Sequence, residues 1–199
     1  MLTSLAVCST SMWAFDGLEV QSLEAAALHI SFLVVVKDQG ASLPTSNIVF
    51  ENMTISSQDD VSGWTQAQWV ANARDGFDAQ SSAGGVDTKC ISMTGSHISN
   101  VRFGAALAAD STLFSGNEID HFGDDGIDYA ASDLNITKNY IHDNLDIGDG
   151  NHPDAMQGVI GVLPAGVAVN NFESILIDSN TVIRQTDPNL AFPGGLQGI

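Results

Sequence analysis

Basic residues are scarce in this chain. Only six of its 199 residues are Lys or Arg, against 24 Asp or Glu, and the formal net charge is −18. A surface this acidic repels phosphate backbones and anionic lipid head groups, so neither nucleic acid nor a membrane is an expected partner. The same surface attracts metal cations, and it favours neutral sugars over acidic ones unless cations neutralise the contact. Solubility is the alternative explanation for the acidity.

Cysteines and long apolar runs are also lacking. Cys8 and Cys90 are the only cysteines, which is too few for a disulfide framework, and we expect both to be small core residues. The longest apolar stretch, ISFLVVV (30–36), has the length of a strand. It is well short of the ~18 apolar residues of a membrane helix. The N-terminal residues lack the basic segment of a signal peptide.

Only one stretch, TQAQWVANARD (65–75), is long enough for a helix of more than two turns. The chain instead repeats a short β-branched run, a small or polar residue that is usually Asn, and another apolar residue. Four segments share this form: CISMTGSHI (90–98), TLFSGNEI (112–119), LNITKNYI (134–141) and SILIDSNTV (174–182). Ile119 follows Ile98 by 21 positions, and Ile141 follows Ile119 by 22. A period near 22 with short strands predicts a solenoid of stacked coils.

Stacked coils lie ~4.8 Å apart, so equivalent residues form ladders along the solenoid axis. Asn117 and Asn139 are 22 positions apart, and we expect them to stack at a turn with their amides hydrogen-bonded. The step from Ile141 to Val182 is 41 positions. It corresponds either to two coils or to one coil with an inserted loop.

The units of the form IxIxxNxI resemble the PbH1-type repeats of the pectate-lyase-like superfamily, whose fold is a right-handed parallel β-helix. LNITKNYIHDN, TLFSGNEIDHF and ILIDSNTVI carry the resemblance, which extends over residues 45–199. It implies one all-β solenoid domain over residues 1–199, with inserted loops at 62–77 and 143–172. The chain ends on GGLQGI, which is typical of the middle of a coil, so we expect a fragment of a longer protein.

Members of this superfamily include polysaccharide lyases, glycoside hydrolases, uronan epimerases, phage tailspikes and proteins without known activity, so the fold does not settle the function. The resemblance implies a carbohydrate-active protein that cleaves an extended polysaccharide by hydrolysis or lyase chemistry. The alternative is a non-catalytic tailspike, adhesin or glycan-binding module, for which a homotrimer is expected. Both interpretations favour an extracellular or cell-surface location.

A second pattern contains the candidate catalytic residues. DGFDA (75–79), DGIDY (125–129), DAMQG (154–158) and GGLQG (194–198) look like one repeated site. If these copies superpose, Asp128, Gln157 and Gln197 share one row, and Asp125 stacks on Asp154. Stacked carboxylates raise one another's pKa, which provides the acid and the base that glycoside hydrolysis needs. Four residues are expected to be catalytic: Asp125, Asp128, His152 and Asp154. Gln157 is expected to bind substrate. The alternative is that these aspartates cap turns.

The loop DNLDIGDGNHPDAMQG (143–158) is the candidate metal site. Asp143, Asp146 and Asp149 supply the oxygen ligands that Ca²⁺ prefers, although their spacing is not that of an EF-hand. Bound calcium would neutralise a uronate in lyase chemistry.

Histidines and aromatic residues supply the remaining candidates. In register, Asp120 lies beside His142, an arrangement typical of either a catalytic base or a surface ladder of alternating charge; the ladder is favoured. His142 is a candidate substrate-binding residue, whereas His97 is expected to be structural. Trp64 and Trp69 are candidates for stacking on sugar rings, and covering the apolar side of the solenoid is their alternative role.

Overall fold

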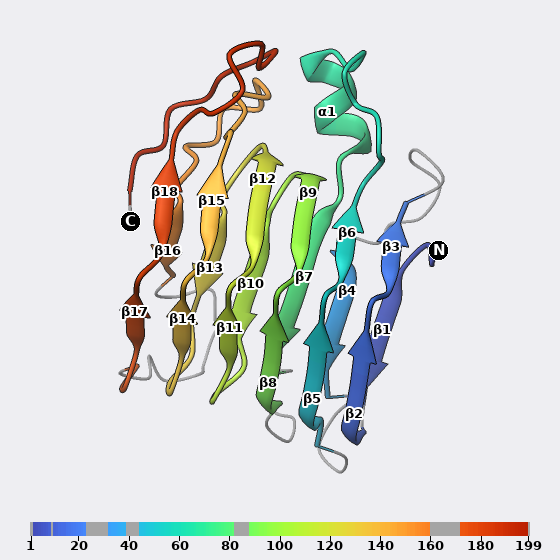
Figure 1. Cartoon of the computed structure of the whole chain (residues 1–199), viewed down its shortest axis with the longest axis vertical. Coiled ribbons are helices and arrows are strands. Elements are labelled where there is room, and N and C mark those ends of the chain that lie inside the picture. The colour runs from blue at the N-terminus through green and yellow to red at the C-terminus, as the bar shows by residue number, and fades with distance from the viewer. Residues whose placement is uncertain are drawn as a thin grey trace.

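A computed structural model describes residues 2–8, 10–22, 32–38, 44–81, 88–159 and 172–198. The chain forms three sheets of six parallel strands each, and it visits the sheets in turn (Figure 1). Strands that are consecutive in the chain lie in different sheets, and each pairs with the strand three places further on. The expected all-β fold, a parallel β-helix, is confirmed.

The strands are short, and each sheet takes one strand from every coil. The first sheet contains β1 (Leu5–Cys8), β4 (Phe32–Lys37), β7 (Asp75–Gln80), β10 (Ala105–Ala108), β13 (Ile127–Tyr129) and β16 (Met156–Gly158). The second contains β2 (Ser11–Asp16), β5 (Ser46–Glu51), β8 (Lys89–Thr94), β11 (Leu113–Ser115), β14 (Asn135–Thr137) and β17 (Leu176–Asp178). The third contains β3 (Glu19–Gln21), β6 (Thr54–Ser56), β9 (His97–Val101), β12 (Glu118–Phe122), β15 (Tyr140–His142) and β18 (Thr181–Ile183).

The predicted ladder of isoleucines is present in the third sheet. Ile98 pairs with Ile119, Ile119 with Ile141, and Ile141 with Val182. The 41 positions between Ile141 and Val182 are therefore one coil with an insertion. Part of the predicted 143–172 insertion, residues 160–171, lies outside the described residues, and β16 interrupts the remainder.

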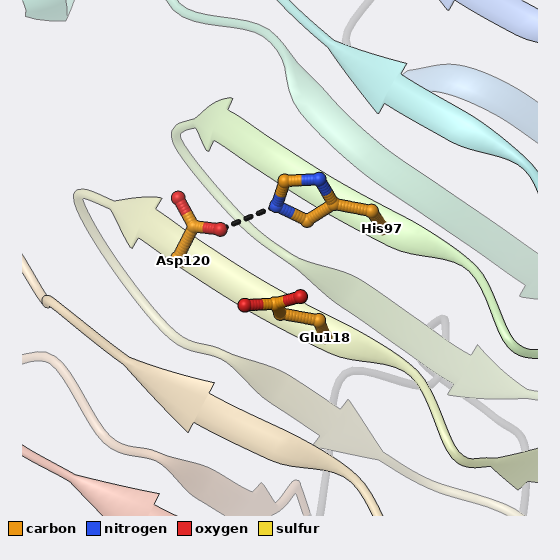
Figure 2. Close-up of side chains that lie close together, drawn as sticks. All are labelled: His97, Glu118 and Asp120. Atoms are coloured by element: carbon orange, nitrogen blue, oxygen red, sulfur yellow. Dashed lines mark hydrogen bonds and ion pairs between the residues drawn. The ribbon is translucent and has the colours of Figure 1, made fainter.

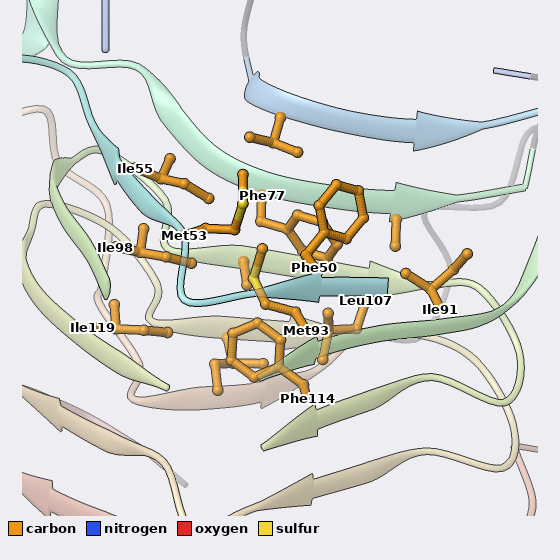
Figure 3. Close-up of a cluster of buried hydrophobic side chains, with 14 of the residues drawn as sticks. Phe50, Met53, Ile55, Phe77, Ile91, Met93, Ile98, Leu107, Phe114 and Ile119 are labelled. Atoms are coloured by element: carbon orange, nitrogen blue, oxygen red, sulfur yellow. The ribbon is translucent and has the colours of Figure 1, made fainter. Parts of the chain in front are cut away.

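Inward-facing side chains fill the solenoid with one continuous core (Figure 3). Because neighbouring side chains on a strand point to opposite faces, each short strand contributes one or two residues to it. The rings of Phe50 and Phe77 pack edge to face with centroids 5.5 Å apart, and Phe114 lies 6.4 Å from Phe77. All three are fully buried. Phe77 of the first sheet thus packs between Phe50 and Phe114 of the second sheet, so the core joins the two sheets across successive coils.

The predicted asparagine ladder closes one turn of the solenoid. Asn117 Nδ2 donates to Asn139 Oδ1 at 3.2 Å, and Asn139 Nδ2 donates to Asn180 Oδ1 at 2.9 Å. The same side chains also donate to buried carbonyl oxygens, as Asn139 does to Phe114 O at 3.0 Å. Since buried amides are costly without partners, this row stabilises the turn. Asn180 is the third member, one insertion further along the chain.

The one helix of the described residues, α1 (Gln66–Asn72), falls within the predicted 62–77 insertion. Thr65 and Gln68 form a capping box at its N-terminus, which satisfies backbone N–H groups that would otherwise lack partners. Residues 75–77 of the predicted insertion belong instead to β7. Within the described part of the chain, no helix is long and apolar enough to cross a membrane.

Candidate functional site

An acidic cluster lies at the turn between the third and the first sheet, along the edge of the solenoid that carries α1 (Figure 1). Asp125 precedes β13 and Asp128 lies within it, while Asp154 and Gln157 occupy the corresponding places at β16. Asp128 pairs with Gln157 in register, and Asp154 N donates to Asp125 Oδ1 at 2.7 Å. The predicted stacking of these residues is confirmed, whereas their catalytic role stays a prediction.

Glycines allow the coils to approach closely beside this cluster. A Cβ atom on Gly126 would lie 2.6 Å from the carbonyl oxygen of Ala155, and one on Gly104 would overlap the carbonyl oxygen of Gly126. No side chain fits between these backbones, which explains the Gly after Asp125. Asp125 is thereby held at the point where the sheet bends into the turn.

Burial sets the proton affinities of the central carboxyl pair. Burial, followed by repulsion from the neighbouring carboxylates of Asp125, Asp154 and Asp124, raises the pKa of Asp128 to about 7. Burial also raises the pKa of Asp125, but hydrogen bonds from Asp154 N and from Asp128 oppose that rise. Asp128 Oδ1 is buried without a hydrogen-bond partner. Asp128 is therefore about half protonated at neutral pH, beside a second carboxyl group whose own pKa burial raises.

Arg102 neutralises the aspartates on one side of the cluster. Its Nε lies 3.2 Å from Asp75 Oδ1 and 3.4 Å from Asp124 Oδ2. Burial nevertheless raises the pKa of Asp124 to about 6. These are the only ion pairs between an arginine or lysine and a carboxylate in the described residues, so Asp125 and Asp128 have no such partner. The predicted site omits Asp124, although its place directly before Asp125 is a usable signal.

His152 and Gln157 border the carboxyl pair on the open side. The His152 side chain is 60% exposed, and its Nδ1 lies 3.8 Å from Asp154 Oδ2. Gln157 is half-buried in β16. Gln197 does not extend the row of Gln157 as predicted, because its backbone N donates to Pro153 O at 2.9 Å and so places it beside Asp154. The segment 194–198 runs beside β16 without forming a strand, so it is not paired with β16 in register.

A further acidic residue lies in the row of Asp128. Asp78 pairs with Ala106, and Ala106 pairs with Asp128, so one coil with a small side chain separates the two aspartates. Two strand spacings correspond to about 9–10 Å. Burial raises the pKa of Asp78 to about 7. The predicted alignment of the two DGxD segments is correct, but it misses the intervening coil at β10.

The tryptophans pack rather than present free faces. Trp69 is 2% exposed and lies in a second core with Leu145, Ile147 and Leu190. Trp64 packs edge-on against Trp69 with ring centroids 5.1 Å apart, and it remains partly exposed. The structure therefore favours the covering role for Trp69, which has no face open to a sugar. This second core attaches α1 to the loop after β15.

The three aspartates of the predicted calcium site do not gather. Asp143 is 2% exposed, and its oxygens accept hydrogen bonds from Thr186 and from His142. Asp146 Oδ1 accepts from Gly148 N and Asp149 Oδ1 accepts from Asn151 N, both at 3.0 Å. Asp146 and Asp149 thus cap turns of their own loop, which is the role that short side-chain acceptors commonly play. Protein donors thus occupy or orient oxygens of all three aspartates, and the calcium site at these residues stays a prediction.

His142 lies beside Asp120 in register, as predicted. Its ring bonds other carboxylates, however: Nδ1 lies 2.7 Å from Asp143 Oδ2 and Nε2 lies 3.0 Å from Glu118 Oε1. The residue is 7% exposed. Both ring nitrogens are engaged within the protein, so His142 is poorly placed for the predicted contact with substrate.

The family comparison agrees with this architecture. A family model described as "Right handed beta helix region" matches residues 29–187, and thus most of the chain. Neither a curated protein nor a solved structure matches.

Proposed function

Since this chain belongs to the right-handed β-helix family, whose stacked strands present long faces along one axis, we propose that it hydrolyses glycosidic bonds of an extended polysaccharide. The single observation that carries the proposal is the close carboxyl pair of Asp125 and Asp128, because burial raises the pKa of both and that of Asp128 to about 7, so Asp128 keeps a proton in about half of the molecules at neutral pH. Two carboxyl groups of unequal pKa are what glycoside hydrolysis requires.

Each carboxyl group has a defined task in this proposal. Asp128 donates its proton to the leaving glycosidic oxygen. The carboxylate form of Asp125 or its neighbour Asp154 takes a proton from the attacking water, whose oxygen bonds to the sugar carbon as the glycosidic bond breaks. His152 and Gln157 lie beside the pair and hydrogen-bond to sugar hydroxyls. Arg102 is occupied by Asp75 and Asp124, and the surrounding carboxylates repel a uronate, which favours hydrolysis of a neutral sugar polymer over lyase chemistry.

The pH dependence of turnover follows from the proton on Asp128. The pKa of this acid is raised to about 7, so its protonated fraction falls as pH rises through that value. We expect activity to be highest below neutral pH and to decline above it. A rate that rises steadily from pH 6 to pH 9, recorded as reducing ends released per minute, would contradict the assignment of Asp128 as the acid.

The direct test is a panel of neutral and acidic polysaccharides, with and without EDTA. New reducing ends without absorbance from unsaturated uronate are the expected result with a neutral polymer. We expect Asp128→Asn to reduce turnover at least about 100-fold, since general acid catalysis contributes about that much or more. Asp133→Asn is the matched control, because Asp133 is exposed on the opposite part of the same coil. Absence of reducing ends across the panel, or full turnover in Asp128→Asn, would overturn the proposal.

A further inference from the structure

A second group of titratable side chains lies on the outer face of the third sheet, away from the carboxyl pair (Figure 2). His97 on β9 pairs in register with Glu118 on β12, and Asp120 lies two residues further along β12. Residues two apart on a strand point to the same face. As Figure 2 shows, the three side chains point toward one another, and their ligand atoms all lie within 4.8 Å of each other.

Within the described residues, the carboxylates of this group contact histidines and no lysine or arginine. Asp120 accepts hydrogen bonds from His97 and His121, and Glu118 Oε1 lies 3.0 Å from His142 Nε2. No lysine or arginine of the described chain forms an ion pair with either acid. When His97 is neutral, the carboxylates of Glu118 and Asp120 give the group a double negative charge, which one divalent cation balances.

The group is open to solvent, and it has a supporting layer. The side chains of His97 and Glu118 are 43% and 47% exposed, so an ion has access to them. Behind Glu118, His142 is itself oriented by Asp143, whose Oδ1 accepts from Thr186 N and Asp187 N. Outer partners that fix the orientation of a ligand are typical of metal sites.

We propose that His97, Glu118 and Asp120 bind one divalent first-row transition-metal ion, with zinc preferred. An imidazole nitrogen with two carboxylate oxygens suits zinc, cobalt or manganese, whereas calcium and magnesium prefer oxygen ligands alone. Zinc accepts imidazole and carboxylate ligands in four-coordinate sites, which fits three protein ligands, and manganese is the weakest binder of the series. Three protein ligands leave further positions for water on the solvent side, as in zinc sites that are not purely structural. The site is distinct from the calcium site predicted at residues 143–149.

The test uses the whole chain, freed of metal with EDTA and dialysed, and titrated calorimetrically with zinc chloride. One zinc ion per chain is the expected result. Changing an outer-layer residue costs about 10–100-fold in affinity, so His142→Gln should weaken binding by about 10-fold. His97→Ala and Glu118→Gln remove ligands and should weaken it by at least about 100-fold. Because both ligand side chains are half-exposed, these variants should fold, and the far-UV circular dichroism spectrum checks this.

Two matched controls make the result specific. Glu51→Gln changes an exposed glutamate on the second sheet, and it should bind zinc as the unchanged protein does. His152→Ala removes the exposed histidine of the other site, and it should also leave the zinc affinity unaltered. Zinc affinity that falls in His152→Ala but not in His97→Ala would assign the ion to the acidic cluster and overturn the proposal. Absence of zinc binding at millimolar concentration, with no visible spectrum from added Co²⁺, would overturn it as well.

Discussion

Replacing Asp128 by Asn should stabilise the protein, and the gain should depend on pH. The folded protein holds a proton on Asp128 up to a pKa of about 7, whereas the ordinary value is 3.8. Between these pH values the folded state binds more protons than the unfolded state, so the free energy of unfolding falls as pH rises. Above about pH 7 both states are ionised at this residue, and the loss is complete.

The size of the effect follows from the pKa difference. The shift from 3.8 to about 7 corresponds to about 4 kcal/mol at 1.36 kcal/mol per pKa unit. Asp128 is only half-buried and shares its proton with Asp125, so solvent screening reduces the expected value to about 2 kcal/mol. The Asn side chain keeps the shape and can donate an N–H to Asp125, so it loses little where Asp128 is protonated. The gain should therefore be close to zero at pH 4 and about 2 kcal/mol at pH 8.

Urea unfolding followed by circular dichroism at pH 4 and pH 8 measures this difference directly. Asp133→Asn is the control, because it removes an exposed carboxylate of the same coil, and it should show no comparable gain at either pH. An Asp128→Asn variant that is less stable at pH 8, or equally stabilised at both pH values, would refute the reasoning. The same variant should lose turnover, so its stability and activity are expected to change in opposite directions.

Three further substitutions test the fold. Asn139→Ala removes a ladder amide that is 1% exposed. It should lower the free energy of unfolding by about 3–5 kcal/mol, at roughly 1–1.5 kcal/mol for each hydrogen bond lost. Asn135→Ala, at an exposed position, should change the free energy of unfolding little in the same urea titration. Gly104→Ala places a methyl group against the backbone of the next coil and should prevent stable folding. In Gly63→Ala the added methyl group has no atom within 4 Å, so this variant should melt as the unchanged protein does. Trp69→Ala should cost about 3–5 kcal/mol and expose the loop 143–155 to proteolysis, which gel analysis of the fragments can follow.

The periodic parts of this fold are predictable from the sequence because stacking repeats the same contact. Ile98, Ile119 and Ile141 occupy equivalent inward positions, so their spacing alone predicts their register. The coil that contains β10 escapes prediction, since Ala105–Ala108 has neither alternating polarity nor β-branched residues. In this coil the small side chain of Ala106 lies between Asp78 and Asp128, which occupy the same row on the coils to either side.

The polar parts are less predictable because side-chain rotamers decide which neighbours meet. Register predicts that Asp120 lies beside His142, and it does. Asp120 nevertheless bonds His97 diagonally across the sheet, while His142 bonds Glu118. A spacing rule between directly paired residues cannot identify such diagonal partners. The loop aspartates are another example: Asp146 and Asp149 accept from their own loop, whereas Asp143 accepts from Thr186 and Asp187, far along the chain.

One short segment, residues 118–128, contains carboxylates of both sites. It includes Glu118 and Asp120 on the third sheet and, after the turn, Asp124, Asp125 and Asp128 on the first. Placing so many acids in one segment costs stability, as the raised pKa values of the last three show. Three fully buried side chains in the same segment offset that cost: Ile119, Phe122 and Ile127. Together they contribute about 4.5–9 kcal/mol, which exceeds the penalty of about 2 kcal/mol at Asp128. A coil needs only the apolar residues in order to stack, so the costly carboxylates are explained better by binding and chemistry than by folding.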